Sequence, residues 1–254
     1  MHSGVGRIAP MRMRTMSLWE SKESNGKVSL ASLFEGDADV AAISDLTIEG
    51  LAYATCRGGW PASTKLREKA ALRVARNYVE EVINYDVHRV DGVDKNTTRV
   101  RKLLESYARN ISTMAANETI MADVRATDQT ISPNTFAIYL SALRRIFIVD
   151  DVPAWSPALR SKTKIRTSPK RHFVDPSIAV ALMGTNPQGL LKDFPTFGFL
   201  FEDLCARDLR VYAQAQNLFT FTKFSGLDPE GTSNLYAAQY PMSRQFTFGL
   251  DLMF

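Results

Sequence analysis

Apolar side chains recur at helical spacing through most of the chain and at strand spacing only near its two ends. Over residues 63–86, Leu66, Ala70, Val74 and Tyr78 recur at every fourth position with charged side chains between them, which predicts an amphipathic helix. The two glycines and the proline of residues 57–61 break the preceding helical pattern. Further helices are predicted over about residues 43–56, 96–114, 177–183 and 194–214.

Residues 118–155 have a more specific order: a short helix, a polar turn, a second helix and an apolar strand at 146–149. Ser132 is a favourable N-cap residue and Pro133 a favourable first helical residue, so the second helix should begin there. Helix, turn, helix and strand in this order are typical of a winged helix-turn-helix. The pattern also fits an ordinary helical hairpin followed by a strand, and the two interpretations stay open.

Strands are expected at both ends of the chain. Residues 12–18 read as a strand, and residues 172–184 as a short strand running into a helix. Apolar and polar residues alternate over 217–224 and again over 244–254, with a turn-rich loop between them. The predicted fold class is α+β, mostly helical, with a winged helix-turn-helix centre and a short two-stranded β tail at the C-terminus.

The positive charge is concentrated in one segment of the chain. The 254 residues carry a formal net charge of only +4, but no acidic residue occurs from Trp155 to Val174, where six basic residues lie. Such local charge attracts phosphate groups and predicts weak, salt-sensitive binding of nucleic acid. The alternative is a solvated loop, or a surface that packs on an acidic domain. The residues predicted to bind nucleic acid are Arg144, Arg145, Arg160, Lys162, Lys164, Arg166, Lys170 and Arg171.

The sequence shows no constellation of catalytic, cofactor-binding or metal-binding residues. Gly4 and Gly6 lack the lysine and the further glycine of a phosphate-binding loop. The three histidines, His2, His88 and His172, have no Cys or carboxylate at ligand spacing, and the two cysteines form no CxxC pair. No signal peptide or long apolar run is visible. We therefore expect a cytoplasmic protein without a membrane partner.

Several linked motifs resemble one bacterial family. "RGGWPAS", "SPNTFAIYLSALRRIFIVDDVPAWSPALRSK", "SPKRHFVDPSIAVALMG" and "FGFLFEDLCARDLRVYAQ" occur in that order. Over residues 1–214 the chain resembles the C-terminal part of AAA-type ATP-binding proteins that carry the domain of unknown function 4143. The resemblance implies a winged helix followed by a nuclease-like α/β fold, and ATP as the cofactor of the intact family. Gly58, Gly59 and Trp60 match the family's GGW signature.

The nucleotide-binding motifs of that family do not occur in this sequence. In proteins of that family, the Walker A lysine loop, the Walker B acidic strand and the sensor all lie N-terminal to the segment that matches residue 1 here. No ATP-contacting residue is therefore carried over to this sequence. The resemblance divides the chain into an ATPase remnant (1–61), a helical region with the winged helix (62–165) and a truncated nuclease-like start (166–214). A separately encoded N-terminal ATPase half is an expected partner if the protein uses ATP at all.

The last forty or so residues resemble a different family. "NLFTFTKFSGLDPEG" and "YPMSRQFTFGLDLMF" are similar to the final strands of SusC/RagA-type TonB-linked outer-membrane receptors. Thr247, Gly249, Leu252 and Phe254 match the spacing of the signal by which such barrels are recognised for assembly. Two strands do not close a barrel, so we expect a receptor-like hairpin over residues 215–254 without receptor function.

These observations predict a truncated, non-enzymatic member of the AAA/4143-type family that binds nucleic acid weakly. Two alternatives come from other classes of protein. One is a fragment of a TonB-linked outer-membrane nutrient receptor. The other is an ATPase whose nucleotide-binding half is encoded separately.

Overall fold

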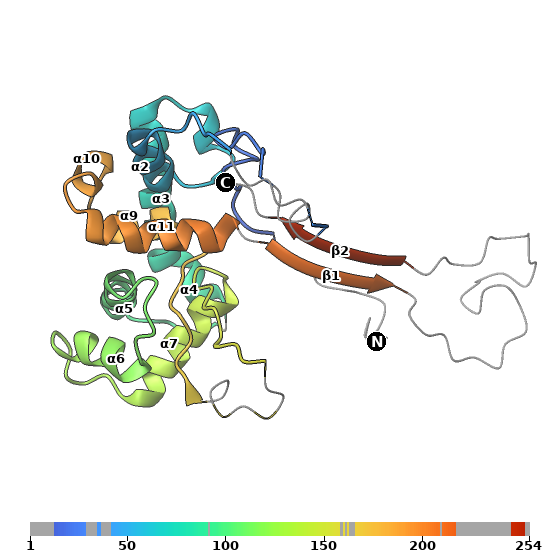
Figure 1. Cartoon of the computed structure of the whole chain (residues 1–254). Helices are drawn as coiled ribbons and strands as arrows, with labels where there is room; N and C mark the ends of the chain where they lie inside the picture. The colour runs from blue at the N-terminus through green and yellow to red at the C-terminus, as the bar shows by residue number, and fades with distance from the viewer. Residues whose placement is uncertain are drawn as a thin grey trace, which may run out of the picture.

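The structure is a computed structural model that describes residues 13–28, 35–36, 42–90, 92–157, 160, 162, 166–208, 210–216 and 245–251. The described part is mostly helical (Figure 1). Its helical elements are α2 (Ile48–Arg57), η1 (Ser63–Lys65), α3 (Glu68–Glu81), the π-helical η2 (Val82–Asp86), α4 (Val87–Arg89), α5 (Thr97–Arg109), α6 (Asn117–Arg125), α7 (Pro133–Arg145), α9 (Pro176–Met183), α10 (Pro187–Leu190) and α11 (Phe194–Asp208).

Helix α9 is the centre of the helical body. Its first five residues, from Pro176 to Val180, are all buried, as expected for a helix that is apolar on every side. It contacts α2, α3, α5 and α11. In Figure 1, α9 and α11 cross between a group formed by α2 and α3 and a group formed by α5, α6 and α7. One cluster of buried apolar side chains runs from Ala52 to Leu200 through both groups.

This single core crosses two of the predicted domain boundaries. The boundaries at 61/62 and 165/166 fall inside the cluster, because Ala52, Val79, Phe173 and Leu200 all belong to it. Between residues 166 and 208 the described elements are α9, α10 and α11, with isolated bridges at Lys170 and Phe173, so these residues show no α/β sheet in the part of the chain that the structure describes.

Local signals predicted the helices well and the short strands poorly. Residues 13–18 form no strand in the structure, although the Met16 N–H donates to the carbonyl of Gly59 at 2.7 Å. The strand predicted over residues 146–149 is also wrong. Ile146 ends α7, and Phe147 takes a left-handed φ of 60°, which turns the chain back toward the core.

The last helix ends earlier than its apolar pattern predicted. Helix α11 stops at Asp208, and β1 (Arg210–Gln216) pairs antiparallel with β2 (Gln245–Asp251), with Ala213 opposite Phe248. The predicted loop over residues 225–234 and the terminal Leu252 and Phe254 lie outside the described residues, as do His2, Gly4 and Gly6. A receptor-like tail therefore stays a prediction.

Candidate nucleic-acid interface

Helices α6 and α7 and the turn between them form the core of the candidate site. The side chain of Ser132 accepts a hydrogen bond from Thr135 N–H at 3.0 Å and Pro133 is the first helical residue, which confirms the predicted start of α7. In the turn, Asp128 pairs with Arg99 of α5 at 2.5 Å and accepts a hydrogen bond from Thr130. The hydrogen bonds from Arg99 and Thr130 lower the pKa of Asp128 to about 2, so this anchor stays ionised.

One face of α7 is exposed and has no acidic side chain. Phe136, Leu140 and Leu143 point into the core, since they recur at helical spacing. The exposed residues repeat at i, i+3, i+4 and i+7 on the opposite side and end at a pair of arginines. They are Asn134, Ala137, Ile138, Ser141, Arg144 and Arg145.

A pairing of two extended segments follows α7 directly. Val149 bridges Phe173 and Val152 bridges Lys170, both antiparallel. Backbone hydrogen bonds join them: Asp150 N–H to His172 O at 2.9 Å, and Val152 with Lys170 in both directions at 2.9 and 2.8 Å. Residues 153–169, which include most of the basic run, therefore connect two paired segments.

The predicted basic residues have different environments. Arg145, Arg160, Lys162 and Arg166 are exposed. Arg144 is exposed but bound to Asp151 at 2.6 Å, and Lys170 is half-buried and paired with Glu202. Lys164 lies outside the described residues.

Arg171 has a structural position that conflicts with phosphate contact. Its side chain is 1% exposed, and its guanidinium donates to Ala115 O at 2.8 Å, to the Asn117 side chain at 2.9 Å and to Asp151 at 3.2 Å. Tyr107 donates its hydroxyl to the same carboxylate. Because the N–H donors of the Arg171 guanidinium are already hydrogen-bonded inside the core, Arg171 is not part of the interface that the sequence predicted.

A second set of exposed cations was missed by sequence reasoning. It lies on η1, at the residue preceding α3 and on α3, and comprises Lys65, Arg67, Lys69, Arg73 and Arg76. The signal was present, because Lys69, Arg73 and Arg76 recur at i, i+4 and i+7. It was overlooked because Glu68, Glu80 and Glu81 mask the local excess of positive charge in the linear sequence.

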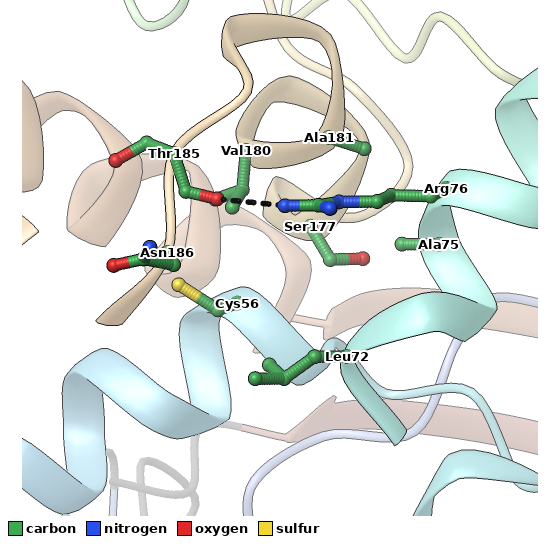
Figure 2. Close-up of a pocket in the computed structure, with 9 residues that line it drawn as sticks. All are labelled: Cys56, Leu72, Ala75, Arg76, Ser177, Val180, Ala181, Thr185 and Asn186. Carbon is green, nitrogen blue, oxygen red and sulfur yellow. Dashed lines mark hydrogen bonds between the residues drawn. The ribbon is translucent and has the colours of Figure 1, made fainter. Parts of the chain in front are cut away.

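Arg76 also lines a small cavity between α2, α3 and α9 (Figure 2). The cavity volume is about 30 Å³, the space of one water molecule. Cys56 points into it, and burial raises the pKa of that thiol to about 12, so the thiol stays protonated and unreactive. The guanidinium of Arg76 donates to the carbonyl of Thr185 at 3.4 Å. This cavity does not accommodate a nucleotide or a comparable ligand.

A buried polar network joins four segments of the chain. Gly59 N–H donates to Asp175 at 2.8 Å, and the indole of Trp60 donates to Ser177 at 2.9 Å. Arg207 donates to Asp175 at 3.2 Å and to Asp208 at 2.8 Å. The second oxygen of Asp208 accepts from the backbone N–H of residue 18 at 3.0 Å. These contacts give the GGW motif a structural role in holding the N-terminal segment, α9 and α11 together.

The described part of the chain offers no arrangement for a metal ion, since no group of three or more His, Cys, Asp or Glu side chains converges there. None of the helices described is both long and apolar enough to cross a lipid bilayer.

The chain matches one curated protein over a short stretch. It is similar to the TonB-dependent receptor SusC of Bacteroides thetaiotaomicron, with 39% identity over 75 residues. That match covers 27% of this chain and 8% of the receptor, so the chain spans a small fraction of the relative's length. No solved structure matches the chain.

A protein-family model matches the helical body itself. It covers residues 48–189, from the start of α2 through most of α10, and so includes α6, α7, the paired segments and the cations of α3. The matched range also crosses the two domain boundaries at which the sequence was divided, in agreement with the single core. The chain therefore belongs to the family defined by the domain of unknown function DUF8612.

Proposed function

We propose that this chain is a binding protein whose helical body contacts the phosphate backbone of nucleic acid through α7 and the basic segment after it. The observation that carries the proposal is the antiparallel pairing of Val149 with Phe173 and of Val152 with Lys170. The basic segment therefore connects two paired segments directly after α7, as expected if α6 and α7 are the two helices of a helix-turn-helix. That is the place of the wing in a winged helix.

The charges on this surface support backbone contact more than base readout. Arg145, Arg160, Lys162 and Arg166 are exposed cations, and α7 has no acidic residue to repel a phosphate. The exposed face of α7 offers Asn134 and Ser141 as its neutral hydrogen-bonding side chains. We therefore expect weak binding that depends steeply on salt and little on sequence.

A triple variant tests the proposal. Arg160, Lys162 and Arg166 are changed together to Gln, and binding of a labelled duplex DNA is followed by fluorescence anisotropy at several salt concentrations. The slope of log K against log salt should fall by about three, because each lost phosphate contact removes close to one released counterion. The control changes Lys22, Lys27 and Arg89 to Gln, which removes the same charge from exposed positions elsewhere. An equal loss of slope in both variants would show that only net charge matters and would reject the interface.

The membership of an AAA/4143-type family remains part of the proposal, supported by the order of the motifs quoted above. The Walker motifs of that family do not occur in this sequence, so the proposed role of this chain is binding without catalysis. If a nucleotide site exists, it is supplied by a separately encoded ATPase half.

A second candidate function is favoured by the similarity to SusC. The matching stretch suits a piece of a TonB-dependent receptor, in which case the region after α11 would associate with an outer membrane. Fractionating cells that express the chain with and without residues 209–254 tests this. Membrane association that depends on those residues would support the receptor alternative over the nucleic-acid proposal.

A further inference from the structure

The cations of η1, the residue before α3 and α3 form a surface separate from α7. Lys65, Arg67, Lys69, Arg73 and Arg76 are all exposed, and none forms an ion pair with another residue of the described ranges. By contrast, Arg144 and Lys170 of the first surface are paired with acids.

Three of these cations lie in a line on α3. Lys69, Arg73 and Arg76 share one face, which lies beside the face of the buried Ala71, Ala75 and Val79. With a rise of about 1.5 Å per residue they span roughly 10 Å of a regular helix, a length that covers more than one phosphate of a nucleic-acid strand.

The acids of α3 do not cancel this line. Glu68 lies on another face of the helix, because each residue turns an α-helix by about 100°. Glu80 continues the line but is bound by Arg101 of α5 at 2.6 Å. Within the described residues, Lys69, Arg73 and Arg76 form no ion pair, and the exposed Glu81 at the end of α3 lies five positions beyond Arg76, so the stripe is positive from Lys69 to Arg76.

The chemistry of the stripe favours one class of partner. An amphipathic helix that binds lipid inserts its apolar face, but the apolar face of α3 is buried in the core. Within α3 no large apolar side chain is exposed, and Leu66, just before the helix, is the exposed leucine of this surface. Protein interfaces are centred on clusters of aromatic or large apolar anchors rather than on one leucine. Interfaces with nucleic acid are polar and strongly positive. We infer that Lys69, Arg73 and Arg76 form a second phosphate-backbone contact surface for nucleic acid, independent of the one on α7.

This inference extends the proposed function to a second surface, so its test must separate the two. The double variant Lys69→Gln and Arg73→Gln is compared with Lys22→Gln and Lys27→Gln, which removes equal charge from exposed sites. Arg76 is left intact because it also holds the carbonyl of Thr185. Melting temperatures of both variants check that the fold is preserved, as expected for exposed side chains.

For binding of a labelled duplex, the slope of log K against log salt should be smaller by about two in the double variant of α3 than in the wild type. At low salt this variant should bind roughly three- to tenfold more weakly, while the affinity and the slope of its control should stay close to those of the wild type. An α3 variant that binds as the control does would overturn the inference, whatever the triple variant of the basic segment shows. A loss in the α3 variant with none in the triple variant would support this surface and reject the one on α7.

Competition distinguishes nucleic acid from an acidic protein. Unlabelled duplex should displace the labelled duplex at a lower concentration than polyglutamate does, when both competitors are compared by their concentration of negative charges. If polyglutamate competes equally and the α3 variant changes its affinity by the same factor, the stripe is an acidic-protein surface and the inference is wrong.

Discussion

His172 and Asp203 form a buried pair in which Nδ1 of the histidine lies 2.7 Å from Oδ1 of the carboxylate. Both side chains are less than 5% exposed, and Phe173 N–H donates to the same oxygen at 3.2 Å. The second oxygen of Asp203 has no hydrogen-bond partner. The pair joins the segment leading into α9 to α11, so the packing of these elements depends on its charge state.

This pair should make stability depend on pH. Burial raises the pKa of Asp203 from 3.8 to about 6, against the lowering effect of the hydrogen bond with His172. A raised carboxyl pKa means that the folded state holds a proton that the unfolded state has released. Its stabilising contribution is complete below about pH 3.8 and is lost as the pH rises through about 6.

The Asp203→Asn variant tests this dependence, because it cannot ionise. The free energy of unfolding of the wild type, measured relative to the variant by urea denaturation, should fall as the pH rises from about 4 to about 6. A difference that stays constant over that range would show that Asp203 titrates normally.

The GGW turn should tolerate no side chain at its second glycine. A Cβ atom added to Gly59 would lie 2.0 Å from the carbonyl oxygen of Met16, and backbone cannot move as a flexible side chain can. We expect Gly59→Ala to lower the free energy of unfolding by about 3 kcal/mol or more. Chemical denaturation measures the change.

Gly198 supplies the matched control for that substitution. It is exposed within α11, and an added Cβ would meet nothing within 4 Å. Gly198→Ala should therefore stabilise the protein by about 0.5–1 kcal/mol, since alanine is the better helix former. Destabilisation by both substitutions to the same extent would contradict the structural role given to Gly59.

Arg207 should be among the side chains most important for stability. It is 3% exposed and pairs with both Asp175 and Asp208, so Arg207→Ala would leave two buried carboxylates without their cation. The expected loss is about 3–5 kcal/mol. The control is Arg109→Ala, which breaks an ion pair with Asp123 whose arginine is 66% exposed, and should cost about 1 kcal/mol or less. Equal losses would mean that the buried network is not a stabilising unit.

Sequence reasoning succeeded where the cause of a structure is local. The cap at Ser132 and the proline after it depend on adjacent residues, so the start of α7 could be predicted. The apolar residues 146–149 fit a strand and a turn equally well, and the left-handed φ of Phe147 gave no signal in the sequence.

The remaining errors have non-local causes. Arg171 looked like the other cations of its segment, but its burial depends on Ala115, Asn117 and Asp151, which lie at least twenty residues away. The role of Gly59 likewise depends on the close approach of Met16 from the N-terminal segment. The stripe on α3 could have been found from the spacing of its cations alone. That Glu80 does not neutralise it could be seen only in the structure, where Glu80 is paired with Arg101.

Nucleotide binding should be absent in this chain on its own. The sequence contains neither a lysine loop to cradle the phosphates nor an acidic strand to hold magnesium. Calorimetric titration with Mg-ATP should give no dissociation constant tighter than roughly millimolar. Micromolar binding would reveal a nucleotide site and favour an enzymatic role.

The region after Gln216 should contribute little to the stability of the helical body. Its sequence alternates aromatic and polar residues at Phe219, Phe221, Phe246 and Phe248, and an isolated two-stranded hairpin is marginal in water. The apolar alternation should instead promote self-association.

Deleting residues 217–254 tests both expectations. Because one core joins residues 52 to 200, the melting temperature should change by less than about 2 °C, while light scattering should show that the shortened protein stays monomeric at higher concentration. The full chain measured at low concentration is the control, since it separates the loss of the tail from the loss of association. A fall of ten degrees or so would require contacts between the tail and the helical body worth roughly 3–5 kcal/mol, and would make the tail an integral part of this fold.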